Sequence, residues 1–290
     1  MDELAKAQLP REIISGIGRV KNEISSLGAD VFRGNGLYRP VMHLLKNGGK
    51  LVRPTLVLIG AYLLGKKTDE FVDMAVAAEL LHVSSLIHDD IIDGDAKRRG
   101  VDAVHVKYGN EIAILAGDAL ISKAIGLAAG YGDGVLRLIS NATMDMCAGE
   151  IIDHECQEEQ RVPSLAEYKE IARLKSASLI AACCSIAAVH SKDRGSASSL
   201  YDFGEKMGIA FQMRDDIMDF SASESTIADR YRPNVVTSLI KESSISEREA
   251  LRRAAELNNK YVDEAVVSIS RIKGSGAVVR YAGLIRMPTT

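Results

Sequence analysis

The hydrophobic residues of this chain gather in long stretches that predict helices rather than strands. Residues 71–93 contain no Gly or Pro and are rich in Ala and Leu, and residues 135–159 form a second stretch of similar length. The alternation of apolar and polar residues that marks a strand is nearly absent, as are Asn-Gly hairpin signals. The pattern therefore predicts an all-α fold made of a single bundle of long helices.

Short polar signals indicate where helices begin. Ser164 with Glu167, and Ser246 with Glu249, have the spacing of a capping box, in which polar side chains bond to the first backbone amides of a helix. No strong linker, fixed repeat or low-complexity tract divides the chain, so residues 1–290 are predicted to form one domain. The least regular stretches are 94–104, 191–196 and 221–235.

Composition narrows the class of protein only slightly. The 290 residues are 47% hydrophobic and 26% charged, with a net charge of −3, so the charge balance gives no reason to expect binding to nucleic acid or to a membrane surface. The four cysteines lack metal-ligand spacing, and the charged N-terminus lacks a signal-peptide core, so a cytoplasmic protein with reduced thiols is expected. The longest uncharged apolar run, 176–189, is too short to span a bilayer, and no transmembrane segment is predicted.

Two aspartate motifs stand inside apolar sequence. The segment SLIHDDIID contains Asp89, Asp90 and Asp93, and FQMRDDIMDF repeats the spacing with Asp215, Asp216 and Asp219. The first and last aspartate of each motif share a helix face, where like charges repel. A solvated helix end would explain one motif, but two motifs facing one cavity need multivalent cations to hold the carboxylates together. Mg²⁺ completes its shell with water and substrate phosphates, so the pattern predicts a diphosphate held between two acidic helices.

Cationic residues lie close to these motifs in the sequence. They are Lys50 and Arg53 in GGKLVRP, His82 two helical turns before Asp89, Arg98 and Arg99 in KRRG, and Lys175 in an apolar helix. Each has an ordinary alternative, such as solvation of a helix start or loop, a satisfied core histidine, or a lysine that reaches the surface. Together they exceed the needs of one diphosphate, and arginine forks suit phosphate oxygens. Two bound diphosphates are therefore expected, one through metal and one through protein cations.

With these motifs in order, the sequence resembles the trans-type isoprenyl diphosphate synthases, or polyprenyl synthetases. The resemblance runs from Gly48 to Ile240 through GGKLVRP (48–54), ELLHVSSLIHDDIID (79–93), RRG (98–100), AILAGDAL (113–120), LKSASLI (174–180) and GIAFQMRDDIMDF (208–220). It implies the isoprenoid synthase fold around a deep central cavity and a homodimer. It also implies head-to-tail condensation of isopentenyl diphosphate with an allylic diphosphate, with about three Mg²⁺ ions per active site once diphosphate is bound.

The resemblance assigns roles to individual residues. The implied metal ligands are Asp89, Asp93, Asp215 and Asp219, with Asp90 and Asp216 as supporting or alternate ligands. The implied isopentenyl diphosphate site is Lys50, Arg53, His82 and Arg99, and the implied allylic diphosphate site is Arg98, Lys175, Ser176 and Gln212. Ser176 stands where the family usually has Thr, which keeps the hydroxyl. Mg²⁺, Arg98 and Lys175 would stabilise the charge of the departing diphosphate.

Some positions depart from the family pattern. After the second motif the family usually reads close to GKxxGxD…GK, whereas this chain reads SASESTIADRYRPNVVTSLI. The lysine that touches the allylic diphosphate is therefore missing, and Arg230 and Arg232 are the candidate replacements. Glu150 stands where many members have Gln, and RRGVDAVH lacks the usual Pro-Thr pair. No metal ligand is lost, so activity is expected.

The length of the product is predicted from the helix that precedes Asp89. Ser85 and Ser84, four and five residues earlier, lie near its face and are small. Bulky aromatics at these positions stop the chain at about C15 to C20 in the family, and one turn deeper, about 5.4 Å, Leu81 and Leu80 are expected to form the floor. A C25 product, and at least C20, is predicted. The alternative is that the two serines only allow close helix packing.

Two other functions stay open on the sequence alone. A terpene cyclase also uses an aspartate-rich helix and Mg²⁺, although it has no need of an isopentenyl diphosphate site. A non-catalytic regulatory subunit of a heteromeric synthase typically loses its acidic motifs, whereas this chain keeps both. Product analysis with an allylic diphosphate alone separates the first, and an assay of the purified chain alone separates the second.

Overall fold

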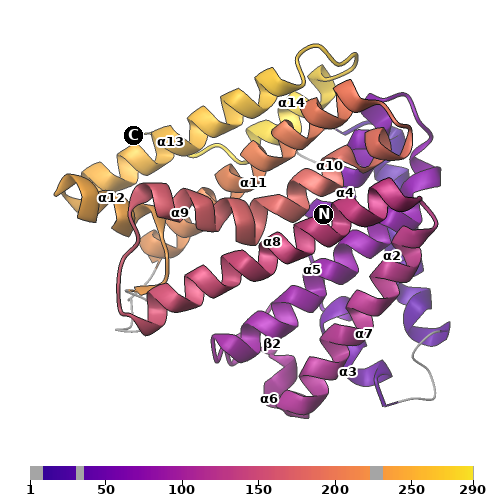
Figure 1. Ribbon diagram of the computed structural model, residues 1–290, viewed down its shortest axis with the longest axis horizontal. Coiled ribbons are helices and arrows are strands. Elements are labelled where there is room, and N and C mark those ends of the chain that lie inside the picture. Colours follow the sequence, from indigo (N-terminus) through magenta and orange to yellow (C-terminus); the bar gives the residue numbers. More distant parts are fainter. Residues whose placement is uncertain (1–8, 31–35, 223–230, 290) are drawn as a thin grey trace.

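The protein is a bundle of helices, as the sequence predicts (Figure 1). The computed structural model describes residues 9–30, 36–222 and 231–289. Its first half contains α2 (Arg11–Asp30), α3 (Tyr38–Lys46), α4 (Val52–Leu63), η1 (Thr68–Phe71), α5 (Val72–Ile92), β1 (Lys97–Arg98), β2 (Val101–Asp102), α6 (Val104–Tyr108) and α7 (Asn110–Ala129). Its second half contains α8 (Asp133–Glu158), α9 (Leu165–Ala172), η2 (Arg173–Ala177), α10 (Ser178–His190), α11 (Arg194–Ala222), α12 (Val235–Ser243), α13 (Glu247–Ser268) and α14 (Gly276–Gly283).

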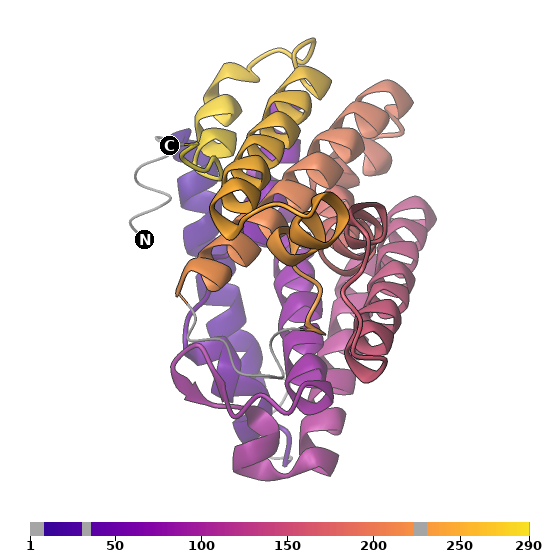
Figure 2. The same cartoon turned by 90° about the vertical axis from the view of Figure 1, so that its left-hand side faces the viewer.

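The most apolar helices lie in the middle of the bundle. Every residue of α10 from Ser178 to Ala188 is buried, and α10 packs against α4 on one side and α11 on another. Helix α5 is also buried around most of its surface and packs against α7 and α4. Figure 2 shows α13 and α14 at one end of the molecule and α6 at the other. A helix that is apolar all round must be covered by others, which explains why α5 and α10 are central.

In both predicted capping boxes, the structure confirms the hydrogen bond accepted by the serine side chain. The Ser164 side chain accepts a hydrogen bond from the Glu167 amide at 3.2 Å, and the Ser246 side chain accepts one from the Glu249 amide at 3.3 Å. The two glutamates bind arginines, since Glu167 pairs with Arg161 and Glu249 with Arg252 and Arg253. Ser164 and Ser246 therefore mark the starts of α9 and α13.

Of the irregular stretches predicted by the sequence, residues 94–103 lie between helices, the second is helical from Arg194 onward, and residues 223–230 of the third lie outside the described residues. Residues 94–104 contain the short antiparallel pair β1–β2, and Arg99 turns the chain with a left-handed φ of 54°. Residues 191–193 form the turn between α10 and α11. In the third stretch α11 continues to Ala222, and the chain leading into α12 is described again from residue 231.

A π-helical turn, η2, interrupts the helical run from α9 to α10. Two glycines let neighbouring helices approach this turn closely. A Cβ on Gly149 of α8 would lie 2.4 Å from the Lys175 backbone nitrogen, and one on Gly208 of α11 would lie 2.5 Å from the Ala177 Cα. Such π turns are rare and occur often at functional sites. Here the turn is held between α8 and α11.

Three helical stretches are long and apolar enough to cross a membrane by length and composition alone. They are Thr68–Ile92, Asn110–Ala129 and Leu165–His190. In the first and third, 72% and 83% of the apolar window is buried inside the protein, against 33% in the second, which is α7. The length and composition of these helices therefore do not exclude a membrane span, and the lack of a transmembrane segment remains a prediction from the sequence. All four cysteines are free, and only Cys147 is exposed.

Candidate active site

A cavity of about 300 Å³ lies among α5, α7, α8 and η2. Polar side chains line one end and mainly apolar ones the rest: Asp89, Glu150, Lys175, His88, Ser85, Ser84, Leu81, Ile92, Ile121, Thr143, Met146, Cys147 and Ile151. Three of the four predicted chain-length residues, Leu81, Ser84 and Ser85, are in this lining. Leu80 is not in the lining and packs in the hydrophobic core.

The first aspartate motif divides its carboxylates between two directions. Asp89, on the last turn of α5, lines the cavity, where burial and the nearby Glu150 carboxylate raise the pKa of its carboxyl to about 7. Asp93 follows the helix, and its Oδ1 is buried without a hydrogen-bond partner among the described residues. Asp90 is fully buried and accepts a hydrogen bond from Arg98 Nε at 2.6 Å. The structure therefore places Asp90 against the β1–β2 hairpin.

The second motif, on α11, is divided in the same way. Burial raises the pKa of Asp215 to about 6, against the opposing effect of Lys50, and Asp219 is exposed. Asp216 is buried, and its two oxygens accept hydrogen bonds from Gln212 Nε2 at 2.8 Å and from the Val235 amide at 3.1 Å. Asp216 therefore ties the start of α12 to α11 and has both oxygens engaged by protein donors.

Lys175 projects from the π turn to the polar end of the cavity. Its Nζ lies 2.8 Å from Glu150 Oε2 and also contacts Asp153 Oδ2. Burial lowers the pKa of Lys175, but Asp153, Glu150 and Asp89 together raise it above its ordinary value, so the group stays cationic. Asp153 is a residue that the sequence reasoning missed. Its signal was the three-residue spacing from Glu150 in AGEIID, which puts both carboxylates on one face of α8.

Ser176 and Gln212 form a polar chain beside Lys175. The Ser176 hydroxyl donates to Gln212 Oε1 at 2.6 Å, and Gln212 Nε2 donates to Asp216. The two residues also line a small pocket with Lys175, Asp153 and Tyr168. The residues that the resemblance assigned to an allylic diphosphate are thus brought together, apart from Arg98, which lies with Asp90.

A second group of cations surrounds the Gly48–Gly49 turn. Arg99 donates a hydrogen bond to the Gly48 carbonyl and lies 3.6 Å from Glu79. Burial lowers the pKa of Arg53, whereas Glu79 raises it. Burial also lowers the pKa of His82 well below its ordinary value, and Arg53 and Arg99 lower it further, so this imidazole is neutral. The sequence reasoning missed Glu79, a buried carboxylate that balances these two arginines.

Arg232 lies beside the first aspartate motif. Its guanidinium donates to Asp95 Oδ1 at 3.0 Å and approaches Asp93 Oδ2 to 3.7 Å. Asp95 in turn accepts from Arg98 at 2.9 Å. Of the two candidate replacements for the missing lysine, Arg232 is therefore near the site, whereas Arg230 lies outside the described residues.

The carboxylates of the aspartate motifs fit Mg²⁺ only if other oxygen ligands complete its coordination shell. Within residues 9–30, 36–222 and 231–289, no three His, Cys, Asp or Glu side chains are close enough to hold a metal ion alone. Asp93 Oδ1 and Glu150 Oε1 are nevertheless buried without hydrogen-bond partners in that part of the chain. Buried carboxylates without partners are unfavourable, and a cation would satisfy them. The first motif is thus fit to share Mg²⁺ with substrate phosphate and water oxygens.

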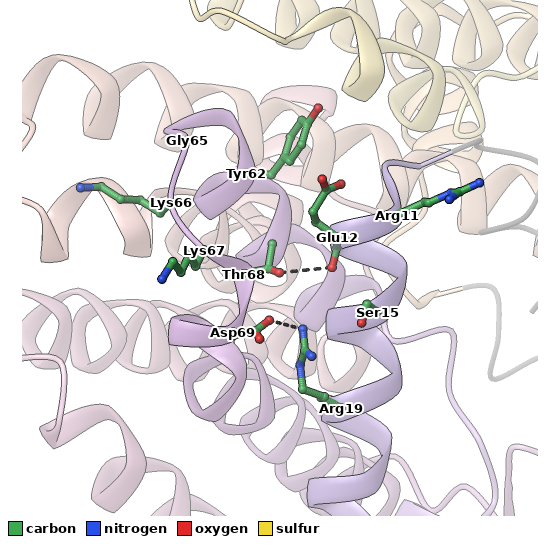
Figure 3. Close-up of a pocket in the computed structure, with 10 residues that line it drawn as sticks. All are labelled: Arg11, Glu12, Ser15, Arg19, Tyr62, Gly65, Lys66, Lys67, Thr68 and Asp69. Carbon is green, nitrogen blue, oxygen red and sulfur yellow. Dashed lines mark hydrogen bonds and ion pairs between the residues drawn. The ribbon is translucent and has the colours of Figure 1, made fainter.

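A larger cavity, of about 580 Å³, lies at the opposite end of α5 (Figure 3). It is lined by Arg11, Glu12, Ser15, Arg19, Tyr62, Gly65, Lys66, Lys67, Thr68 and Asp69. Arg19 pairs with Asp69, and Figure 3 shows Lys66 pointing away from the cavity. Asp89 lies 17 residues after the start of α5, about 25 Å along the helix. This surface hollow is therefore distant from the first aspartate motif.

The structure is therefore an all-α bundle with two aspartate-bearing helices and a cavity beside the first, the arrangement expected of an isoprenoid synthase fold. The chain belongs to the polyprenyl synthetase family, whose sequence model matches residues 35–256.

Individual relatives agree with this assignment. A geranylgeranyl pyrophosphate synthase of Geoglobus acetivorans is 37% identical over 193 residues, which are 64% of this chain and 60% of the relative. A geranylfarnesyl diphosphate synthase of Methanosarcina mazei is 31% identical over 235 residues, 79% of this chain and 77% of the relative. The solved structure of a Geoglobus acetivorans geranylgeranyl pyrophosphate synthetase superposes with a TM-score of 0.85 at 28% identity, covering 95% of this chain and 99% of the other. The first of these matches spans less than two thirds of the relative's length.

Proposed function

We propose that the protein is an isoprenyl diphosphate synthase that condenses isopentenyl diphosphate head-to-tail with an allylic diphosphate. The observation that carries the proposal is the cavity with Asp89, Glu150 and Lys175 at one end and mainly apolar residues beyond. Its polar end suits a diphosphate held through cations, and its apolar part suits a hydrocarbon chain. The family membership and the names of the relatives support the same reading.

The residues would divide the reaction between them. Bound Mg²⁺ would supply positive charge to the departing diphosphate. The carboxylates that would hold the Mg²⁺ are Asp89, Asp93, Asp215 and Asp219. Lys175 and Arg98 stabilise the same leaving charge while the allylic C–O bond breaks. Lys50, Arg53, His82 and Arg99 hold isopentenyl diphosphate, whose double bond attacks the allylic carbon. The new carbocation then loses a proton to the released diphosphate, and the apolar cavity keeps water away from both cations.

The depth of the cavity favours a product of at least C20. Leu81, the lining residue of α5 farthest from Asp89, lies eight residues before it, about 12 Å along the helix. That depth holds roughly two isoprene units beyond the reacting one, at about one unit per helical turn. An allylic diphosphate of three isoprene units therefore fits the cavity, and condensation with isopentenyl diphosphate gives a product of four units. A fifth unit requires space beside or beyond Leu81.

The exposed apolar face of α7 and α8 supports a homodimer. Large apolar side chains are exposed there on both helices: Ile112, Ile114, Leu115, Ile125, Met144 and Ile151. Such a face on a water-exposed helix marks an interaction surface, and we place a second copy of this chain on it, in the cytoplasm. Analytical ultracentrifugation tests this assembly. A dimer is expected for the natural chain and a monomer for Leu115→Lys, and a monomeric natural chain would contradict the assignment.

The activity itself is tested with the purified chain. Incubation with Mg²⁺, isopentenyl diphosphate and a C10, C15 or C20 allylic diphosphate should yield linear diphosphates lengthened by whole isoprene units. A cyclic hydrocarbon formed from the allylic diphosphate alone would instead identify a terpene cyclase. A chain that is inactive alone and activates a second synthase subunit would be a regulatory component.

A further inference from the structure

Asp95 joins two segments that are distant in the sequence. Its Oδ2 accepts a hydrogen bond from Arg98 at 2.9 Å, and its Oδ1 accepts one from Arg232, 137 residues away, at 3.0 Å. Arg98 belongs to the β1–β2 hairpin after the first aspartate motif. Arg232 belongs to the segment between the second motif and α12. One carboxylate therefore holds together arginines that follow different aspartate motifs.

The middle aspartate of each motif fixes one of these segments. Asp90 accepts from Arg98 Nε at 2.6 Å, and its carbonyl accepts from the Asp95 amide at 3.0 Å. Asp216 accepts from the Val235 amide, and its carbonyl accepts from Asn234 Nδ2 at 3.0 Å. The hairpin is thus attached to α5 and the segment before α12 to α11. Asp95 is the link between the two attachments.

This arrangement places the Arg232 guanidinium beside Asp93, a carboxylate that is fit to hold metal, and Arg98 across Asp95 from it. The Arg232 guanidinium lies 3.7 Å from Asp93 Oδ2, so a phosphate bound through a cation on Asp93 would be within reach of it. A guanidinium has five donors, and Asp95 engages one nitrogen of each arginine. Arginine forks bind phosphate oxygens in a fixed geometry. The chain also lacks the family's lysine in this region, as the sequence shows.

We propose that Asp95 is a positioning residue that holds Arg98 and Arg232 side by side for the diphosphate of the allylic substrate. The inference rests on the proposed synthase function and adds Arg232 to that site. Asp95 and Arg232 are 30% and 38% exposed, and ion pairs of this exposure contribute little to stability. Loss of the Asp95 charge should therefore change the binding of substrate much more than it changes folding.

Steady-state kinetics of Asp95→Asn, Arg232→Ala and the double variant test the proposal. Each single variant should raise KM for the allylic diphosphate about tenfold and leave KM for isopentenyl diphosphate within twofold, because the second diphosphate binds near Arg53. The double variant should lose less than the product of the two single losses, since residues that act through one another are not additive. Arg232→Lys should recover part of the loss. Asp69→Asn, which removes the Arg19 pair at the far end of α5 (Figure 3), is the matched control and should leave both constants unchanged.

A binding measurement separates this inference from the proposed function. Titration calorimetry of inorganic diphosphate in the presence of Mg²⁺ needs no turnover, and Asp95→Asn should weaken binding about tenfold with an unchanged melting temperature. Equal diphosphate affinity, or single-variant effects that multiply in the double variant, would overturn the role of Asp95. If the natural chain binds diphosphate in this way but performs no condensation, the proposed function fails and the positioning role stands.

Discussion

Ser84→Phe should shorten the product by about one isoprene unit. Ser84 lines the cavity, is 1% exposed, and its hydroxyl has no hydrogen-bond partner among the described residues, so the change breaks no polar contact there. Ser84 lies five residues before Asp89 and Leu81 lies eight, which are about 7.5 Å and 12 Å along the helix. An aromatic ring at Ser84 therefore removes about 4.5 Å of depth, close to the length of one isoprene unit.

The assay compares product lengths from isopentenyl diphosphate, a C15 allylic primer and Mg²⁺ after the diphosphate is removed. Ser84→Ala is the matched control, because it keeps the cavity open and should keep the natural length. Leu80→Ala should lower the free energy of unfolding by about 2–5 kcal/mol without a change in length, because Leu80 packs in the core. Leu81→Ala should lengthen the product. An unchanged product from Ser84→Phe, with condensation intact, would show that the chain does not pass this residue.

Three further predictions concern the charged groups. Asp89→Ala or Asp215→Ala should lower kcat about a thousandfold, because losing a metal ligand removes several kcal/mol of transition-state stabilisation. A near-normal kcat of either variant in the presence of Mg²⁺ would contradict the role of that residue. Arg53→Ala should mainly raise KM for isopentenyl diphosphate, whereas Lys175→Ala should mainly lower kcat, since only Lys175 faces the departing group; equal effects on both constants would refute this division. Asp89→Asn should stabilise the metal-free protein at pH 8 but not at pH 4 in thermal melts. Burial raises the pKa of Asp89 to about 7, so the natural chain loses stability as the pH rises from about 4 to 7. Equal melting temperatures of the natural chain and Asp89→Asn at pH 8 would argue against this.

Local sequence signals predicted those parts of the molecule that depend on neighbouring residues. The starts of α9 and α13 follow from Ser164 and Ser246, because a cap needs only the amides of its own first turn. Helical spacing does not separate the residues that line the cavity from those in the core. Ser84 lines the cavity although it lies about 140° around the helix from Asp89, and Leu80, four residues earlier on nearly the same face, packs in the core.

The remaining contacts depend on tertiary structure. The pairing of Lys175 with Glu150 and Asp153 requires α8 to pack on the π turn, and nothing in the residues around Lys175 indicates that turn. The contact of Arg232 with Asp95 joins residues 137 positions apart. Sequence reasoning found the residue types that suit a diphosphate but could not show which arginine meets which carboxylate.

The division of each aspartate motif gives a physical reason for its adjacent pair of aspartates. Consecutive residues on a helix point about 100° apart, so Asp89 and Asp90 cannot both face the cavity. Asp90 and Asp216 are instead buried, each with protein donors on a carboxylate oxygen. A buried carboxylate is tolerated when it is hydrogen-bonded, and in both motifs one donor comes from the segment that follows: Arg98 for Asp90 and the Val235 amide for Asp216. The outer aspartates are therefore fit for metal, while the middle aspartate fixes the segment that carries an arginine to the site.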